Sequence, residues 1–320
     1  MRGISAIVKK ELADHFSSYR FMILFALIAM VSLITTYMVG MNLKEELAGV
    51  AKPQFVFLML FTSTGPLFSL VQFIAFFGPL IGLVLGFDSI NRERSTGTLS
   101  KLASQPIYRD SIINGKFLSG VVTITIMVVA IVLVVSGLGL TVIGVVPGIE
   151  EVWRIIVYLV ISVFYISFWL GISILFSILF RGIATSALAT LALWIFFSFF
   201  VSMGASVLAN TMVPLTADSR ADPQQVMRHV KVQRVVSLIS PMQLYNDSTA
   251  IIIDPLRKTT RSLVLMGPIE RLSAARFRRP LSISQSLYVV LPHIISLIAV
   301  TFICFGVSYS VFMRQEIRST

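Results

Sequence analysis

Two groups of residues have side chains that could do chemistry. Neither group has the spacing that its candidate site, a phosphate loop or a copper site, requires. The run from Ile112 to Phe117 (IINGKF) contains the Gly-Lys pair of a nucleotide-binding phosphate loop. It lacks the first glycine of that loop, and Phe117 stands where Ser or Thr would hold magnesium. His293 and Cys304, with Met203, Met212, Met227 and Met242, are ligand types that suit Cu(I). Because His293 and Cys304 are eleven residues apart, we interpret them as packing residues and predict no catalytic residue, cofactor or metal in this chain.

The elements that carry these residues are membrane spans. Of the 320 residues, 56% are hydrophobic and 13% are charged, whereas soluble proteins average about 25% charged residues. Several apolar runs reach the roughly 20 residues needed to cross a bilayer. The predicted fold class is therefore an all-α polytopic membrane protein. Its six predicted spans are residues 21–41, 67–87, 117–146, 155–180, 183–208 and 286–313.

The remaining segments are arranged around these spans. Residues 1–20 predict an amphipathic interfacial helix, or alternatively a plain membrane anchor. Spans one to five lie within 21–208, an extracytoplasmic insert covers 209–285, and the last span and a tail cover 286–320. Helix-start signals in the insert favour a small helical cap over a loose loop. The residues behind these predictions are Ile4, Val8, Leu12 and Phe16 on the first helix, and Asp222-Pro223 and Ser240-Pro241 in the insert.

Lysine and arginine residues predict the orientation. With the N-terminus inside, the short loops and termini on that side hold 12 of them, and the other side holds only Lys44, Lys52 and Arg154. The positive-inside rule then places both termini and residues 88–116 in the cytoplasm of a plasma-membrane protein. The insert is too long for that rule, and its eleven basic and five acidic residues favour an anionic partner or headgroups outside. We interpret the net charge of +11 as topology signal and headgroup contact, not as nucleic-acid binding.

The spans contain no visible source of energy. Within their predicted bounds, the six spans contain no Asp, Glu, Lys or Arg. Ion-coupled carriers, by contrast, usually keep buried carboxylates in their transport paths. An ion-coupled carrier is therefore disfavoured, and the chain lacks a phosphate loop of its own. We expect the energy to come from a partner that acts on the charged segment 88–116. The centre of this segment, Thr98–Gln105, predicts a short helix with Leu99 and Leu102 on one face, and Pro106 ends it.

This segment resembles the signature of type 2 ATP-binding-cassette (ABC) exporter permeases. The signature has an acidic residue after the second span, a charged cluster with glutamate, a Gly-Thr-Leu triplet, a proline, and a Gly-Lys pair that enters the third span. Here these are Asp88, Glu93, Gly97-Thr98-Leu99, Pro106 and Gly115-Lys116. The layout of the whole chain is similar too, but the insert is larger than usual. In this it resembles the nitrous-oxide-reductase maturation permeases, whose outer region meets a periplasmic partner.

The resemblance implies a permease that works as two copies, here as a homodimer in contact with lipid, with two copies of a soluble ABC ATPase. ATP and magnesium would bind to that ATPase, and Thr98–Gln105 would be the coupling helix that docks on it. Alternatively, the segment is a charged loop that only sets topology. Export is the main hypothesis; an ATPase-driven scaffold that signals to an extracytoplasmic partner at 209–285 is the alternative. The expected ATPase-coupling residues are Glu93, Arg94, Gly97, Thr98, Leu99, Lys101, Leu102 and Pro106.

Overall fold

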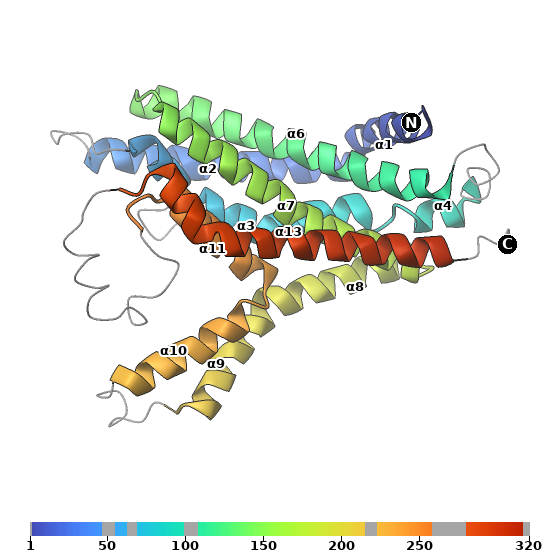
Figure 1. Cartoon of the computed structure of the whole chain (residues 1–320). Coiled ribbons are helices and arrows are strands. Elements are labelled where there is room, and N and C mark those ends of the chain that lie inside the picture. The colour runs from blue at the N-terminus through green and yellow to red at the C-terminus, as the bar shows by residue number, and fades with distance from the viewer. Residues whose placement is uncertain are drawn as a thin grey trace.

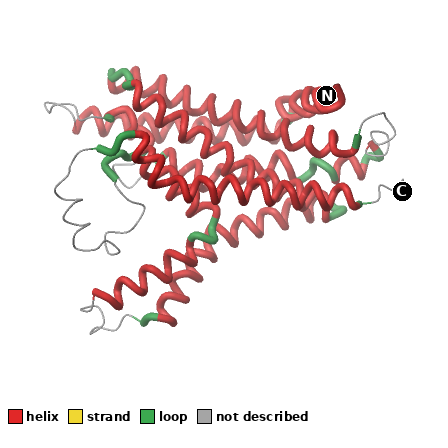
Figure 2. Tube along the Cα trace, viewed as in Figure 1, coloured by secondary structure: helices red, strands yellow, loops and turns green. Residues whose placement is uncertain are grey.

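The computed structural model describes residues 2–46, 55–62, 69–98, 108–214, 223–257 and 280–315. Within these ranges every regular element is a helix and no strand occurs (Figure 2). Six helical stretches are long and apolar enough to cross a membrane, so the prediction of an all-α polytopic protein with six spans is confirmed. These stretches are Tyr19–Glu45, Leu70–Ser95, Arg109–Ile143, Ile149–Leu179, Ile183–Met212 and Ile283–Arg314.

The helices form one elongated bundle with two distinct ends (Figure 1). We call the end with α1, α4 and the last turns of α13 the proximal end, and the opposite end, near α11, the distal end. In chain order the helices are α1 (Arg2–Ser17), α2 (Tyr19–Glu46), η1 (Val56–Phe61), α3 (Leu70–Gly86), α4 (Asn91–Ser95), α6 (Arg109–Ile143), α7 (Ile149–Leu179), α8 (Ile183–Ile195), η2 (Phe196–Phe200), α9 (Val201–Met212), α10 (Pro223–Ser237), α11 (Pro241–Ile253) and α13 (Ile283–Arg314).

Helix α7 is the centre of the bundle. It packs against α3, α6, α11 and α13, and its Trp169 and Tyr165 side chains are almost completely buried. Two of its polar side chains are satisfied across these contacts: the hydroxyl of Tyr165 donates to the carbonyl of Ala75 at 2.6 Å, and that of Ser173 donates to the carbonyl of Leu83 at 2.9 Å. In the absence of water, such bonds replace the hydration that a buried hydroxyl loses.

The contact between α3 and α7 depends on glycine. Gly78, Gly82 and Gly86 recur every four residues on α3, a small-residue spacing that lets two membrane helices approach closely. A Cβ atom at Gly82 would lie 2.7 Å from both the carbonyl oxygen of Ile166 and the amide nitrogen of Leu170. No side chain larger than hydrogen fits there without moving one helix. The second and fourth spans are therefore in backbone contact.

Two of the helices that begin earlier than the predicted spans each bring a charged residue into the bundle. Helix α6 starts at Arg109 and α7 at Ile149, so Lys116 and Arg154 belong to the span helices. Both are buried, at 4% and 0% exposed. Hydropathy alone excluded them because it does not show the partners that compensate a buried charge.

The chain from η2 to α11 comprises the second half of the fifth span and the segment that follows it. After the single π-helical turn η2, α9 continues with α10 packed along it, and this hairpin stands away from the bundle (Figure 1). Helix α11 then returns to pack on α7 and α13. Its residues Tyr245, Ile251, Ile252 and Ile253 are buried, which makes α11 part of the bundle rather than a separate cap.

Candidate functional site

Four charged side chains from three helices meet at the proximal end. The Nζ of Lys116 on α6 lies 2.9 Å from Glu11 Oε1 on α1 and 3.0 Å from Glu93 Oε1 on α4. The Nζ of Lys10 lies 3.2 Å from Glu93 Oε1 and 3.4 Å from Glu11 Oε1. We call Lys10, Glu11, Glu93 and Lys116 the junction cluster. It connects the first helix, the segment after the second span and the start of the third span.

The local sequence explains why α1 can approach α6 here. A Cβ atom at Gly115 would lie 2.7 Å from Cγ2 of Ile7, so only glycine allows this contact. The next residue, Lys116, then extends along the α1 surface to Glu11, one helical turn beyond Ile7. The Gly-Lys pair therefore serves helix packing and ion pairing, and it binds no phosphate through a loop.

The charges of the junction cluster balance one another. Burial by itself would raise the pKa of Glu11, but attraction to Lys116, with smaller contributions from Lys10 and His15, outweighs this and the pKa is lowered. Burial would lower the pKa of Lys10, yet attraction to Glu11 and Glu93 raises it. Each acidic member of the cluster thus lies within 3.4 Å of both basic members. Loss of one member would leave an uncompensated buried charge, which is the costly outcome for such networks.

A second connection holds α4 against the centre of the bundle. The hydroxyl oxygen of Ser177 on α7 accepts hydrogen bonds from the amide groups of Ile90 at 3.0 Å and Asn91 at 3.1 Å. The Asn91 side chain donates to the carbonyl of Gly182, in the turn between α7 and α8, at 3.3 Å. The first amide groups of a helix have no partner within the helix. Ser177 supplies that partner and joins α4 to the fourth span.

The structure describes four of the predicted coupling residues. Glu93 is 8% exposed and faces the bundle, so it is an internal residue of the junction. The Arg94 guanidinium donates to the side chain of Gln315 at 2.7 Å, which links α4 to the residue after α13. Thr98 donates to the carbonyl of Glu93 at 3.3 Å, and Gly97 adopts a φ of +69° that favours glycine. The other four predicted residues, Leu99, Lys101, Leu102 and Pro106, lie outside the described residues.

Sequence reasoning did not find the partners of Glu93. The predicted apolar face of the first helix included Phe16, which is 43% exposed, whereas the residues of α1 that are buried are Ile7 and Glu11. The available signal was the four-residue spacing of Ile7 and Glu11, which puts them on one face. The burial of an acidic residue on that face is explained only by its ion pair with Lys116, which the sequence does not reveal.

At the distal end, Arg154 joins three helices. Its guanidinium donates to the carbonyl of Ile252 at 3.0 Å, to the hydroxyl of Ser286 at 3.2 Å and to the carboxylate of Glu150 at 2.9 Å. It also lies over the ring of Phe55, 5.5 Å from the centroid. A cation at the C-terminal carbonyls of α11 is favourable because of the helix dipole. Arg154 therefore fastens α11 and the start of α13 to α7.

The residues first considered for Cu(I) do not converge. Nε2 of His293 lies 3.9 Å from Oδ2 of Asp247, which Arg234 also contacts at 3.2 Å. Cys304 packs against α7, with its sulfur 4.0 Å from the carbonyl of Phe168. No group of three or more His, Cys, Asp or Glu side chains that could hold a metal ion occurs in the described ranges.

Two members of the junction cluster, Glu93 and Lys116, belong to the signature segment between the second and third spans. A family model described as ABC-2 family transporter protein matches residues 5–317, nearly the entire chain. The chain belongs to the ABC-2 transporter family. It is thus a multi-pass membrane protein and the permease component of an ABC transporter. A search of curated proteins found no match.

Proposed function

We propose that this permease couples ATP hydrolysis by a separate ABC ATPase to export across the plasma membrane. The observation that carries the proposal is the double attachment of α4. Ser177 holds its start on α7, and Glu93 joins it to Lys116 on α6 and Lys10 on α1. A displacement of the segment after α4 would therefore act on three helices at once.

These contacts suggest how a movement of the ATPase would reach the membrane spans. In this proposal the ATPase docks on Thr98–Gln105, as the family resemblance implies, and moves α4 when ATP closes its two copies. Because α3 is in backbone contact with α7 through Gly82, the second and fourth spans would tilt as a unit. The third span would follow through Lys116, since separation of its buried ion pairs is costly.

The proposed role of Glu93 differs from that of its neighbours. Its side chain is 10% exposed, so we assign it to transmission inside the permease. Arg92 and Ser95 on the same helix, and Thr96 directly after it, are exposed and available for contact with the ATPase. Charged groups at the rim of an interface set register and association rate more than affinity. The excess of Lys and Arg at the proximal end supports a cytoplasmic location for this surface.

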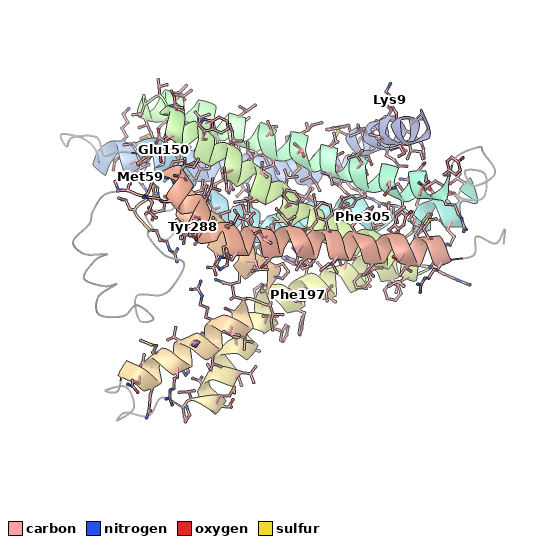
Figure 3. The ribbon with its side chains drawn as sticks, viewed as in Figure 1. Lys9, Met59, Glu150, Phe197, Tyr288 and Phe305 are labelled. Carbon is pink, nitrogen blue, oxygen red and sulfur yellow. The ribbon has the colours of Figure 1, made fainter. Side chains whose placement is uncertain are left out.

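Reconstitution with the ATPase tests this proposal. The permease and a candidate ATPase are co-purified, placed in liposomes and screened for compounds that stimulate ATP hydrolysis. Leu102→Ala should weaken ATPase binding, whereas Glu93→Gln should leave binding intact and lower transport per ATP hydrolysed. Lys9→Gln is the matched control, because Lys9 lies on α1 and points away from the bundle (Figure 3). If both variants behave like this control, the coupling assignment is wrong.

A scaffold without transport is the second candidate, and the α9–α10 hairpin favours it. This hairpin stands away from the bundle and carries exposed basic residues, Arg228 and Lys231, suited to an anionic partner. The same liposomes separate the two functions. An exporter accumulates the stimulating compound on one side during hydrolysis. A scaffold hydrolyses ATP without accumulation and loses partner binding when the exposed residues Arg228 and Lys231 are replaced by Gln.

A further inference from the structure

A cleft of about 750 Å³ opens beside the junction cluster. Its walls come from α1, the α1–α2 turn, the first turn of α2, α3, the segment after α3, α4 and the starts of α6 and α8. The lining divides by chemistry: the apolar residues Phe21, Val84, Leu85 and Ile183 belong to membrane spans or their first turns, and the charged residues belong to α1, the first turn of α2, the segment after α3, α4 and α6. The cleft therefore crosses the level at which a span passes from acyl chains to headgroups.

The charges of the lining sum to zero. Four basic residues, Lys10, Arg20, Arg92 and Lys116, are matched by four acidic residues, Glu11, Asp14, Asp88 and Glu93. Arg92 forms no close ion pair among the described residues and attracts the Asp88 carboxylate only at longer range, so its exposed guanidinium is available to an anionic group. A cleft with separate charges of both signs and no net charge is complementary to a zwitterion rather than to an anion.

One buried oxygen in the lining indicates that the cationic group of the zwitterion must be a hydrogen-bond donor. Glu93 is 92% buried, yet its Oε2 has no hydrogen-bond partner in the described part of the chain. The hydroxyl of Ser89, also in the lining, is buried and unpartnered there as well. An unsatisfied buried carboxylate oxygen is costly and calls for an N–H or O–H donor. A primary ammonium supplies such donors, whereas a trimethylammonium group does not.

We propose that this cleft binds the headgroup of an aminophospholipid from the membrane leaflet at the proximal end. Its ammonium group would donate to Glu93 and Ser89, its phosphate would pair with Arg92, and the upper part of its acyl chains would lie against Phe21, Leu85 and Ile183. The proposal concerns the permease alone and does not depend on ATPase coupling or transport. It adds a lipid ligand to a region that otherwise transmits movement.

Calorimetry with short-chain lipids tests the proposal. Dihexanoyl phosphatidylethanolamine is titrated into the full chain in lipid-free detergent micelles, with empty micelles as the blank. The corresponding phosphatidylcholine and phosphatidylglycerol provide the comparisons, and glycerophosphoethanolamine tests the need for acyl chains. A charge-assisted hydrogen bond predicts that the ethanolamine lipid binds about tenfold more tightly than the choline lipid. Glycerophosphoethanolamine should bind more weakly still.

Two variants locate the binding site. Arg92→Gln removes an exposed phosphate partner and should weaken binding of the ethanolamine lipid about tenfold. Lys9→Gln also removes one positive charge near the proximal end, but Lys9 is not in the lining, so binding should change less than about twofold. Equal binding of the ethanolamine and choline lipids, tighter binding of phosphatidylglycerol, or equal effects of the two variants would overturn the proposal.

Discussion

The replacement of Lys116 by methionine tests the junction cluster most directly. Methionine keeps much of the volume of the side chain but removes the ammonium group that lies 2.9 Å from Glu11 and 3.0 Å from Glu93. Two carboxylates, each 10% exposed, are then left with Lys10, which is 51% exposed. Removal of one partner from a buried ion pair costs about 3–5 kcal/mol. Because Lys10 remains, we expect the lower value, about 3 kcal/mol.

Hydrogen exchange of the α1 amide groups measures this loss of stability in the helix that the cluster holds. Helix α1 rests on α6 through Ile7 and Glu11, so a weaker cluster should raise the fraction of time in which α1 is detached. A loss of about 3 kcal/mol corresponds to roughly a 150-fold change in this local equilibrium. Amide protection in peptides from residues 2–17 should therefore fall by about two orders of magnitude, while protection in α7 stays as in the unmodified protein.

Two comparisons make this prediction sharp. Lys9→Gln removes a neighbouring exposed charge and should leave α1 protection within about twofold. Glu11→Gln in the Lys116→Met background removes one uncompensated carboxylate and should restore at least about tenfold of the lost protection, since effects within one network are not additive. Equal protection in Lys116→Met and Lys9→Gln would refute the reasoning that Lys116 holds α1.

Three further predictions follow from the geometry. Ser177→Ala removes the acceptor of two buried amide groups at the start of α4, costs about 1–3 kcal/mol, and should lower amide protection in residues 88–98; unchanged protection would contradict the proposed link between α4 and α7. Gly82→Ala places a Cβ atom 2.7 Å from backbone atoms of α7 and should lower the thermal unfolding temperature in micelles, whereas Gly204→Ala meets no atom within 4 Å and should not. The pKa of Glu11 is lower in the folded protein than its ordinary value of 4.5, so the ionised carboxylate stabilises the fold above pH 4.5. This stabilisation is lost as the pH falls below 4.5 and through the lower pKa of the folded state. Protection of α1 should therefore fall on acidification below pH 4.5, and Glu11→Gln should flatten this dependence; a parallel fall in that variant would assign the effect to another group.

His15 contributes to the same pH dependence with the same sign. Burial lowers its pKa more than the nearby Glu11 raises it. The unfolded chain therefore binds a proton at His15 at a higher pH than the folded chain does, and stability falls as the pH drops through this range. A His15→Gln variant separates the two contributions, because it removes the component near pH 6.5 and leaves the component below pH 4.5.

The sequence by itself determined that this is a six-span helical membrane protein and that its signature lies between the second and third spans. Length and hydropathy are sufficient for this because a bilayer requires about 20 apolar residues for each crossing. The Gly115-Lys116 pair and Glu93 could be recognised as parts of the signature. Their mutual contact could not be inferred, because it depends on how α1 packs against α6.

Only the tertiary structure decided which charges lie inside the protein. The predicted spans begin directly after Lys116 and Arg154, because a prediction from hydropathy ends an apolar run at a charged residue. In the structure, carboxylates or carbonyl groups from distant segments surround both side chains and offset the cost of their burial. Glu93, which the sequence placed among the expected coupling residues, pairs with Lys116 and Lys10 inside the permease. Ion pairs and capping bonds join residues about a hundred positions apart, and no local periodicity records such pairs.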